Sequence, residues 1–325
     1  MLVRAYRTYQ PALLLGLLLL APAVWSGPFV QGVPLPQGPY MPAYRPLAQA
    51  FALWPWAAPL AGALVTAALA LQLDRLANDR ELFERHHHLP ALLLPLLLAT
   101  GPLRMAPDPA MLGMPAVLHA LRLVWGTQGR HQVLGALFDA GCLVGVAALL
   151  YFPYVFLVVV LWASVAVMRP YAWRDYAVPL LGMVLVLVMA WGVVALTVGP
   201  GAWAPLSTLS LRTADPAPTH WLRDRLAPST VVVLWALAVP SMAGVYRRSI
   251  MREKNVRASF LAFAFTCLLL LGFAALLGHP PSAVLVACPL AVVLSYPLQA
   301  ARHLWPAELA VAVLLVAAVA GPWWG

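Results

Sequence analysis

Residues 133–168 read VLGALFDAGCLVGVAALLYFPYVFLVVVLWASVAVM, which is two apolar runs separated by the short segment Tyr151-Phe152-Pro153. Each run approaches the ~20 residues that an α-helix needs to cross the hydrocarbon core of a bilayer. Lipid offers no partners to backbone N–H and C=O groups, so a segment that crosses it pairs them internally as a helix. The stretch therefore predicts two consecutive transmembrane helices.

The apolar character of this stretch extends through the whole chain. Of its 325 residues, 63% are hydrophobic, and the mean hydropathy is +0.84. Soluble domains contain roughly 45–50% apolar residues, and a single soluble core could not bury so much apolar surface. We therefore expect one integral membrane domain spanning residues 1–325, with an all-α fold: a polytopic bundle of transmembrane helices.

The apolar runs predict about 10–11 spans. They lie near residues 11–26, 52–72, 89–103, 110–124, 133–151, 153–168, 178–198, 230–246, 259–277, 282–298 and 307–323. The third and fourth runs are short and form a pair near residues 89–124. Two tilted spans and one re-entrant hairpin both fit this pair, and either returns the chain to the side that it left.

The basic residues predict the orientation of the chain. Among the 20 basic residues, those that fall in outside segments are Arg45, Arg104, Arg212, Arg223 and Arg225. The others lie in segments on the opposite side, which the positive-inside rule places in the cytoplasm. We therefore expect a multi-pass bacterial inner-membrane protein with a cytoplasmic N-terminus and an outside C-terminus. The net charge of +9 then reflects topology and does not indicate a nucleic-acid partner.

The first span allows two interpretations. Arg4 and Arg7, followed by an apolar run and Ala21-Pro22-Ala23, also resemble a cleavable signal peptide over residues 1–26. Residues 27–50 face outward in both cases. We favour an uncleaved first span.

Asp139 is the acidic residue expected within the hydrocarbon core, where a charge is costly and is usually paired or functional. One helical stripe carries Gln132, Gly135, Asp139, Cys142 and Val146. Gly141 and Gly145 form a small-xxx-small pair on an adjacent stripe, which predicts close helix packing. We expect this packing to turn Asp139 into the bundle. Asp139 and Gln132 are then a candidate polar site for a proton, a cation or a lipid headgroup; the alternative is a structural hydrogen bond or a salt bridge with Arg130.

A second candidate site is an outward cavity bordered by the outside loops. Arg104 and Asp108 lie between the two short helices, which can line such a cavity at membrane depth. The later outside loop contributes His220, Arg223 and Asp224, within a segment (219–226) that we expect to form a short helix on the membrane surface. The alternative for Asp108 is a helix cap in a solvated turn.

Other chemical signatures are weak. His86-His87-His88 does not converge on one ion, because adjacent helical residues point about 100° apart, so no metal site is predicted. The inner segment 74–88 carries charges of both signs and predicts a solvated helical extension. Nucleotide, serine-hydrolase and zinc-protease motifs do not occur in the sequence. We expect no cofactor, and the sequence favours a non-enzymatic role.

Several segments within residues 75–185 resemble a family of bacterial inner-membrane proteins best known from Bacteroidota. They are His88-Leu89-Pro90-Ala91-Leu92, Phe138-Asp139-Ala140-Gly141, Leu150-Tyr151-Phe152-Pro153, Arg169-Pro170-Tyr171-Ala172-Trp173-Arg174-Asp175 and Leu181-Gly182. That family has no established reaction, so the resemblance implies a fold alone.

The same region is similar, more distantly, to the membrane half of multi-span lipid-linked sugar transferases. Those enzymes need an acidic residue in the first outside loop, and residues 27–50 contain none. The resemblance therefore implies a non-catalytic or divergent relative in envelope glycan or glycolipid handling. Its expected partners are membrane lipid, a polyprenyl-linked sugar or a glycan-assembly protein. The alternatives are a small-molecule or ion transporter that uses Asp139, and a scaffold subunit of a membrane complex.

Overall fold

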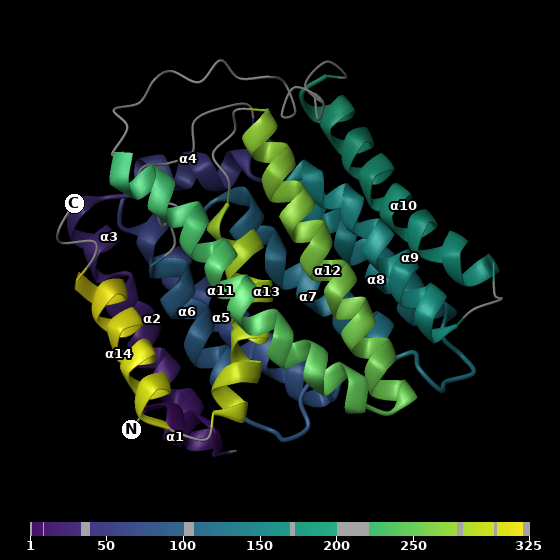
Figure 1. Cartoon of the computed structure of the whole chain (residues 1–325). Helices are drawn as coiled ribbons and strands as arrows, with labels where there is room; N and C mark the ends of the chain where they lie inside the picture. Colours follow the sequence, from purple (N-terminus) through teal and green to yellow (C-terminus); the bar gives the residue numbers. More distant parts are fainter. Residues whose placement is uncertain are drawn as a thin grey trace.

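The computed structural model describes residues 2–8, 10–33, 40–100, 107–169, 173–199, 221–277, 282–301 and 304–320. Across these ranges the chain forms helices and connecting turns, with no strand (Figure 1). The predicted all-α helix bundle is thus confirmed.

The helices follow the apolar runs of the sequence. The first part of the chain forms α1 (Leu2–Tyr6), η1 (Pro11–Gly16), α2 (Leu17–Val24), α3 (Ser26–Gln31) and α4 (Arg45–Leu53). The middle part forms α5 (Ala57–Asp79), α6 (Leu89–Thr100), α7 (Pro109–Trp125), α8 (Leu134–Leu150), η2 (Phe152–Leu157) and α9 (Val158–Met168). The last part forms α10 (Trp173–Thr197), α11 (Trp221–Arg248), α12 (Met251–Leu276), α13 (Ala283–Ala300) and α14 (Leu304–Ala320).

Five helical segments among the described residues are long and apolar enough to cross a membrane. They are Ala12–Gln31, α5, α10, α12 and α13, and shorter apolar helices accompany them. The chain is therefore a membrane protein. One expectation is wrong: α11 runs without a break from Trp221, so residues 221–226 begin a long helix and do not form a separate surface helix.

The segment Tyr151-Phe152-Pro153, which separates the two apolar runs of the sequence, joins α8 to η2 and α9. Pro153 lies at the start of η2, where its missing N–H removes no helical hydrogen bond. The buried Tyr154 hydroxyl donates to the Ala110 carbonyl of α7 at 2.7 Å. This contact fixes the turn against the bundle.

The two short helices lie inside the bundle. Residues 89–98 of α6 are all buried, and its 12 residues extend about 18 Å, less than the ~30 Å hydrocarbon thickness. α6 packs mainly against α13 and α5, whereas α7 packs mainly against α8 and then α5, so the two do not form an isolated hairpin.

The interface between α8 and α10 is built on glycines, as predicted. Gly141 faces the backbone of Pro179, Gly145 faces Met183 and Val186, and Gly182 faces the Phe138 carbonyl. Two helices can approach this closely only where side chains are absent. The α8–α10 contact is therefore set by residues that the sequence identifies.

The same contact overturns the expected direction of Asp139. Asp139 and Gly141 are two residues apart and so point about 200° apart on a helix. With Gly141 packed on α10, the Asp139 side chain is exposed on the outside of the bundle, as is Gln132. Asp139 therefore does not point into the bundle.

Candidate anion-binding site

A buried polar cluster lies where α5 ends and the chain turns toward α6. Nδ1 of His88 and Oδ2 of Asp74 are 2.8 Å apart, and both side chains are at most 4% exposed. The Asn78 amide donates to the His87 carbonyl at 3.0 Å and accepts from the His87 N–H at 3.2 Å. The expectation that the whole segment 74–88 is solvated is therefore wrong, because Asp74, Asn78, His87 and His88 are buried inside the protein.

Two later helices hold the same loop. Nε of the fully buried Arg257 in α12 donates to the Leu82 carbonyl at 2.9 Å, and the Tyr296 hydroxyl of α13 donates to the same oxygen at 2.6 Å. Arg257 also pairs with Glu253 at 3.0 Å. From the sequence, Arg257 was counted among the basic residues on the cytoplasmic side of the membrane. The spacing of Glu253 and Arg257, one helical turn apart, was the signal for a pair.

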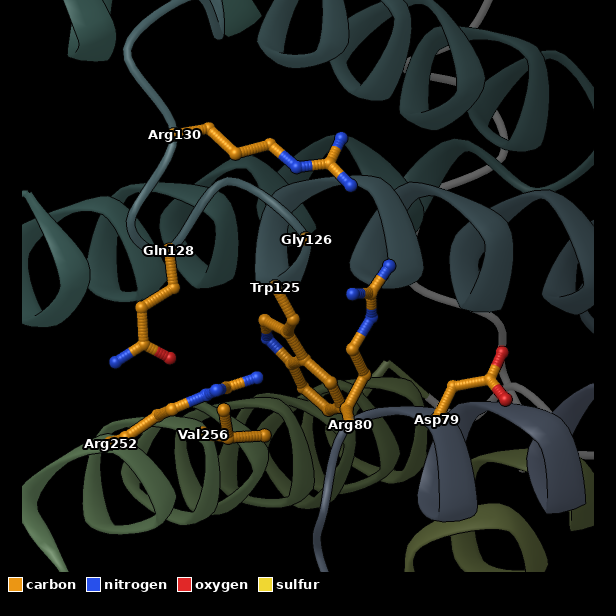
Figure 2. Close-up of a pocket in the computed structure, with 8 residues that line it drawn as sticks. All are labelled: Asp79, Arg80, Trp125, Gly126, Gln128, Arg130, Arg252 and Val256. Carbon is orange, nitrogen blue, oxygen red and sulfur yellow. The ribbon is translucent and has the colours of Figure 1, made fainter.

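The loop places Arg80 beside two other arginines around a cavity of about 140 Å³ (Figure 2). Arg80 follows the last residue of α5, Arg130 lies in the turn after α7, and Arg252 lies in the first turn of α12. Trp125 and Gln128 complete much of the wall. In the sequence, these arginines served only to predict the orientation of the chain in the membrane. Their convergence on one cavity was not predicted.

Positive charge exceeds negative charge at this cavity. Burial first, and then the neighbouring Arg122, Arg130 and Arg252, lower the pKa of Arg80, which Asp79 partly opposes. The Asp79 carboxylate is already paired with Arg122 at 2.5 Å. The pair between Arg252 and Glu81 is exposed and long, at 3.6 Å, so it neutralises little. An anion in the cavity would relieve this repulsion.

The backbone leaves room for the Arg80 guanidinium. Its Nη2 donates to the Arg122 carbonyl at 2.8 Å, while its Nε is buried and has no hydrogen-bond partner among the described residues. A Cβ at Gly126 would lie 2.7 Å from Nη2. Gly126 thus lets the guanidinium reach the cavity wall.

A second, more open hollow of about 400 Å³ adjoins the turn that carries Arg130. It is lined by Trp173, Arg174 and Arg169, among others. Arg169 pairs with the buried Asp175 at 2.6 Å and donates from Nη1 to the Arg130 carbonyl at 2.6 Å. The motif that begins at Arg169 therefore helps to position Arg130.

The predicted outward cavity is described only in part. Asp108 caps α7: its Oδ1 accepts from the Met111 N–H at 2.8 Å, which confirms the capping alternative. Burial raises the pKa of Asp108 to about 6. Arg104 and His220 lie outside the described residues, and so do the side chains of Arg223 and Asp224. Their predicted site stays a prediction. Gln132 and Asp139 line neither of the two hollows above.

His87 gives the loop a testable pH dependence. Burial, and then the neighbouring His88, lower the pKa of His87 to about 4, against about 6.5 in an unfolded chain. The unfolded state then binds the extra proton between these two values, so stability falls as the pH drops from 6.5 toward 4. We expect a loss of about 2 kcal/mol between pH 7.5 and pH 5.

The measurement is the difference in unfolding free energy between wild type and His87→Asn across this pH range. The wild type should lose more stability than the variant on acidification. Parallel pH profiles for the two proteins would contradict a buried neutral imidazole.

Among the described residues, no group of three or more His, Cys, Asp or Glu side chains is placed to hold a metal ion. No protein-family model, curated protein or solved structure matches the chain. The resemblances noted from sequence therefore stay predictions, and a function has to be argued from the site.

Proposed function

We propose that this protein binds the phosphate group of an anionic lipid in the cavity between Arg80, Arg130 and Arg252, as a non-catalytic participant in envelope glycolipid handling. The convergence of the three guanidinium groups carries the proposal. Guanidinium groups match phosphate oxygens in geometry and remain charged at all physiological pH values.

The size and position of the cavity favour a phosphate on a lipid. A volume of about 140 Å³ is well below the ~300–1,000 Å³ of pockets that enclose whole small molecules. A cavity of this size can hold one phosphate group, while the rest of the ligand stays outside the cavity. The cavity also lies at the ends of apolar helices, where lipid headgroups lie in a membrane protein. A polyprenyl phosphate fits both features, and the positive-inside rule would place this end in the cytoplasm.

The test is binding of polyprenyl phosphate to the full-length protein in nanodiscs, measured by native mass spectrometry. The neutral polyprenol with the same tail serves as the matched lipid, and inorganic phosphate tests whether the tail is needed. We expect the phosphate form to bind at least about tenfold more tightly than polyprenol. A charge-assisted hydrogen bond contributes about 1.5–3 kcal/mol, so Arg80→Gln combined with Arg130→Gln should remove that preference.

The matched protein control is Arg248→Gln, which removes an exposed charge near the same end of the bundle without touching the cavity. This variant should retain the preference for polyprenyl phosphate. Equal binding of polyprenol and its phosphate, or equal losses in the control and the cavity variants, would overturn the proposal. Tight binding of inorganic phosphate alone would assign the cavity to a soluble anion.

A further inference from the structure

Asp139 carries a carboxylate on an outer face of the bundle. At membrane depth, the surroundings of such a face are expected to be apolar. Asp139 lies five residues after the first residue of α8, or about 8 Å along the helix. The 17 residues of α8 extend about 26 Å, which is less than the ~30 Å hydrocarbon core. Where α8 crosses the bilayer, Asp139 therefore falls at membrane depth and not in the aqueous loop before it.

The residues around Asp139 leave this face open. Leu134 is 48% exposed and Val146 is 44% exposed. A Cβ built on Gly135 meets no atom within 4 Å, whereas the glycines on the opposite side contact α10. Gly135 and Asp139 are one helical turn apart, so a further helix could approach α8 closely at the carboxylate.

The carboxylate has no partner within the described part of the protein: no hydrogen bond or ion pair to Asp139 is found there. Charged groups at membrane depth ordinarily pair with one another or face a polar interior. Asp139 is exposed and lacks such a partner in the part of the chain that the structure describes, which points to a complement outside this bundle.

We propose that the α8 stripe formed by Gly135, Asp139 and Val146 docks a transmembrane helix of a different protein, and that this helix carries an arginine or lysine at the depth of Asp139. Charge complementarity identifies the partner's chemistry. A second copy of this chain is disfavoured, because a two-fold axis along this stripe would place one Asp139 against the other. The inference is independent of the phosphate cavity.

The first measurement is the thermal stability of the detergent-purified protein with Asp139→Leu. Because the exposed side chain forms no hydrogen bond or ion pair among the described residues, the variant should unfold at the same temperature as wild type or at a higher one. A lower unfolding temperature would show that Asp139 serves the fold of this chain and would overturn the proposal.

The second measurement is photocrosslinking in native membranes, with a photoreactive residue placed at Gly135 or at Val146, and at Val188 on exposed α10 as the control position. We expect Gly135 and Val146 to yield an adduct whose mapped peptide is a transmembrane segment of another protein with Arg or Lys within one turn. Asp139→Asn should reduce that adduct by about tenfold or more, since the partner's cation would be left uncompensated.

Several outcomes would overturn the proposal. They are an adduct with lipid alone, an adduct with a second copy of this chain, no adduct, and a protein adduct that Asp139→Asn leaves unchanged. A partner segment without a basic residue would equally contradict it.

Discussion

Replacing Gly141 with alanine is expected to lower the free energy of unfolding by about 3 kcal/mol. The added Cβ would lie 2.0 Å from the Pro179 carbonyl oxygen and 2.7 Å from its carbonyl carbon. Both are backbone atoms of α10, so no side-chain rotation can relieve the overlap. The two helices would have to separate, and the packing along their whole contact would be lost. Thermal unfolding in detergent measures the effect.

The matched control is Gly135→Ala, six residues earlier on the same helix. A Cβ at Gly135 meets nothing within 4 Å, and alanine favours a helix over glycine by about 1 kcal/mol. This variant should be as stable as wild type or more stable. Equal destabilisation by the two substitutions would mean that α8 does not pack on α10 through Gly141.

Replacing Asp74 with alanine is expected to cost about 3 kcal/mol, because breaking a buried pair by removing one partner leaves the other uncompensated. The His88 imidazole would lose the carboxylate at 2.8 Å in a place that water does not reach. The loop from Arg80 to His88 depends on this cluster. We therefore expect faster amide hydrogen exchange in that loop as well as a lower unfolding temperature.

Asp79→Ala provides the comparison on the same helix. Asp79 also forms an ion pair, with Arg122 at 2.5 Å, but the two side chains are 43% and 40% exposed. Exposed pairs contribute about 0–1 kcal/mol, so this variant should change stability little. A larger loss from Asp79→Ala than from Asp74→Ala would contradict the burial of the Asp74–His88 pair.

Local patterns were enough to predict much of the architecture. The break at Pro153 and the glycines of α8 lie in consecutive or periodic positions, and their consequences follow from helix geometry alone. The direction of Asp139 could not be predicted in this way. Asp139 and the glycines Gly141 and Gly145 lie on neighbouring stripes of one helix, and only the position of α10 decides that the glycines pack while Asp139 is exposed.

The candidate site was hidden for a related reason. Arg80, Arg130 and Arg252 each read as an ordinary basic residue at the end of a span, and nothing near them in sequence marks them out. Asp74 and His88 likewise read as loop charges, although their side chains meet inside the protein.

The sequence by itself determined that this is a membrane helix bundle and where most of its helices run, because hydrophobic length acts on each segment separately. The tertiary structure alone decided which arginines converge, which histidines are buried and which way Asp139 points. Those properties depend on helix rotation and on contacts between segments far apart in the chain, such as α5 and α12 around one cavity. Packing between helices sets both.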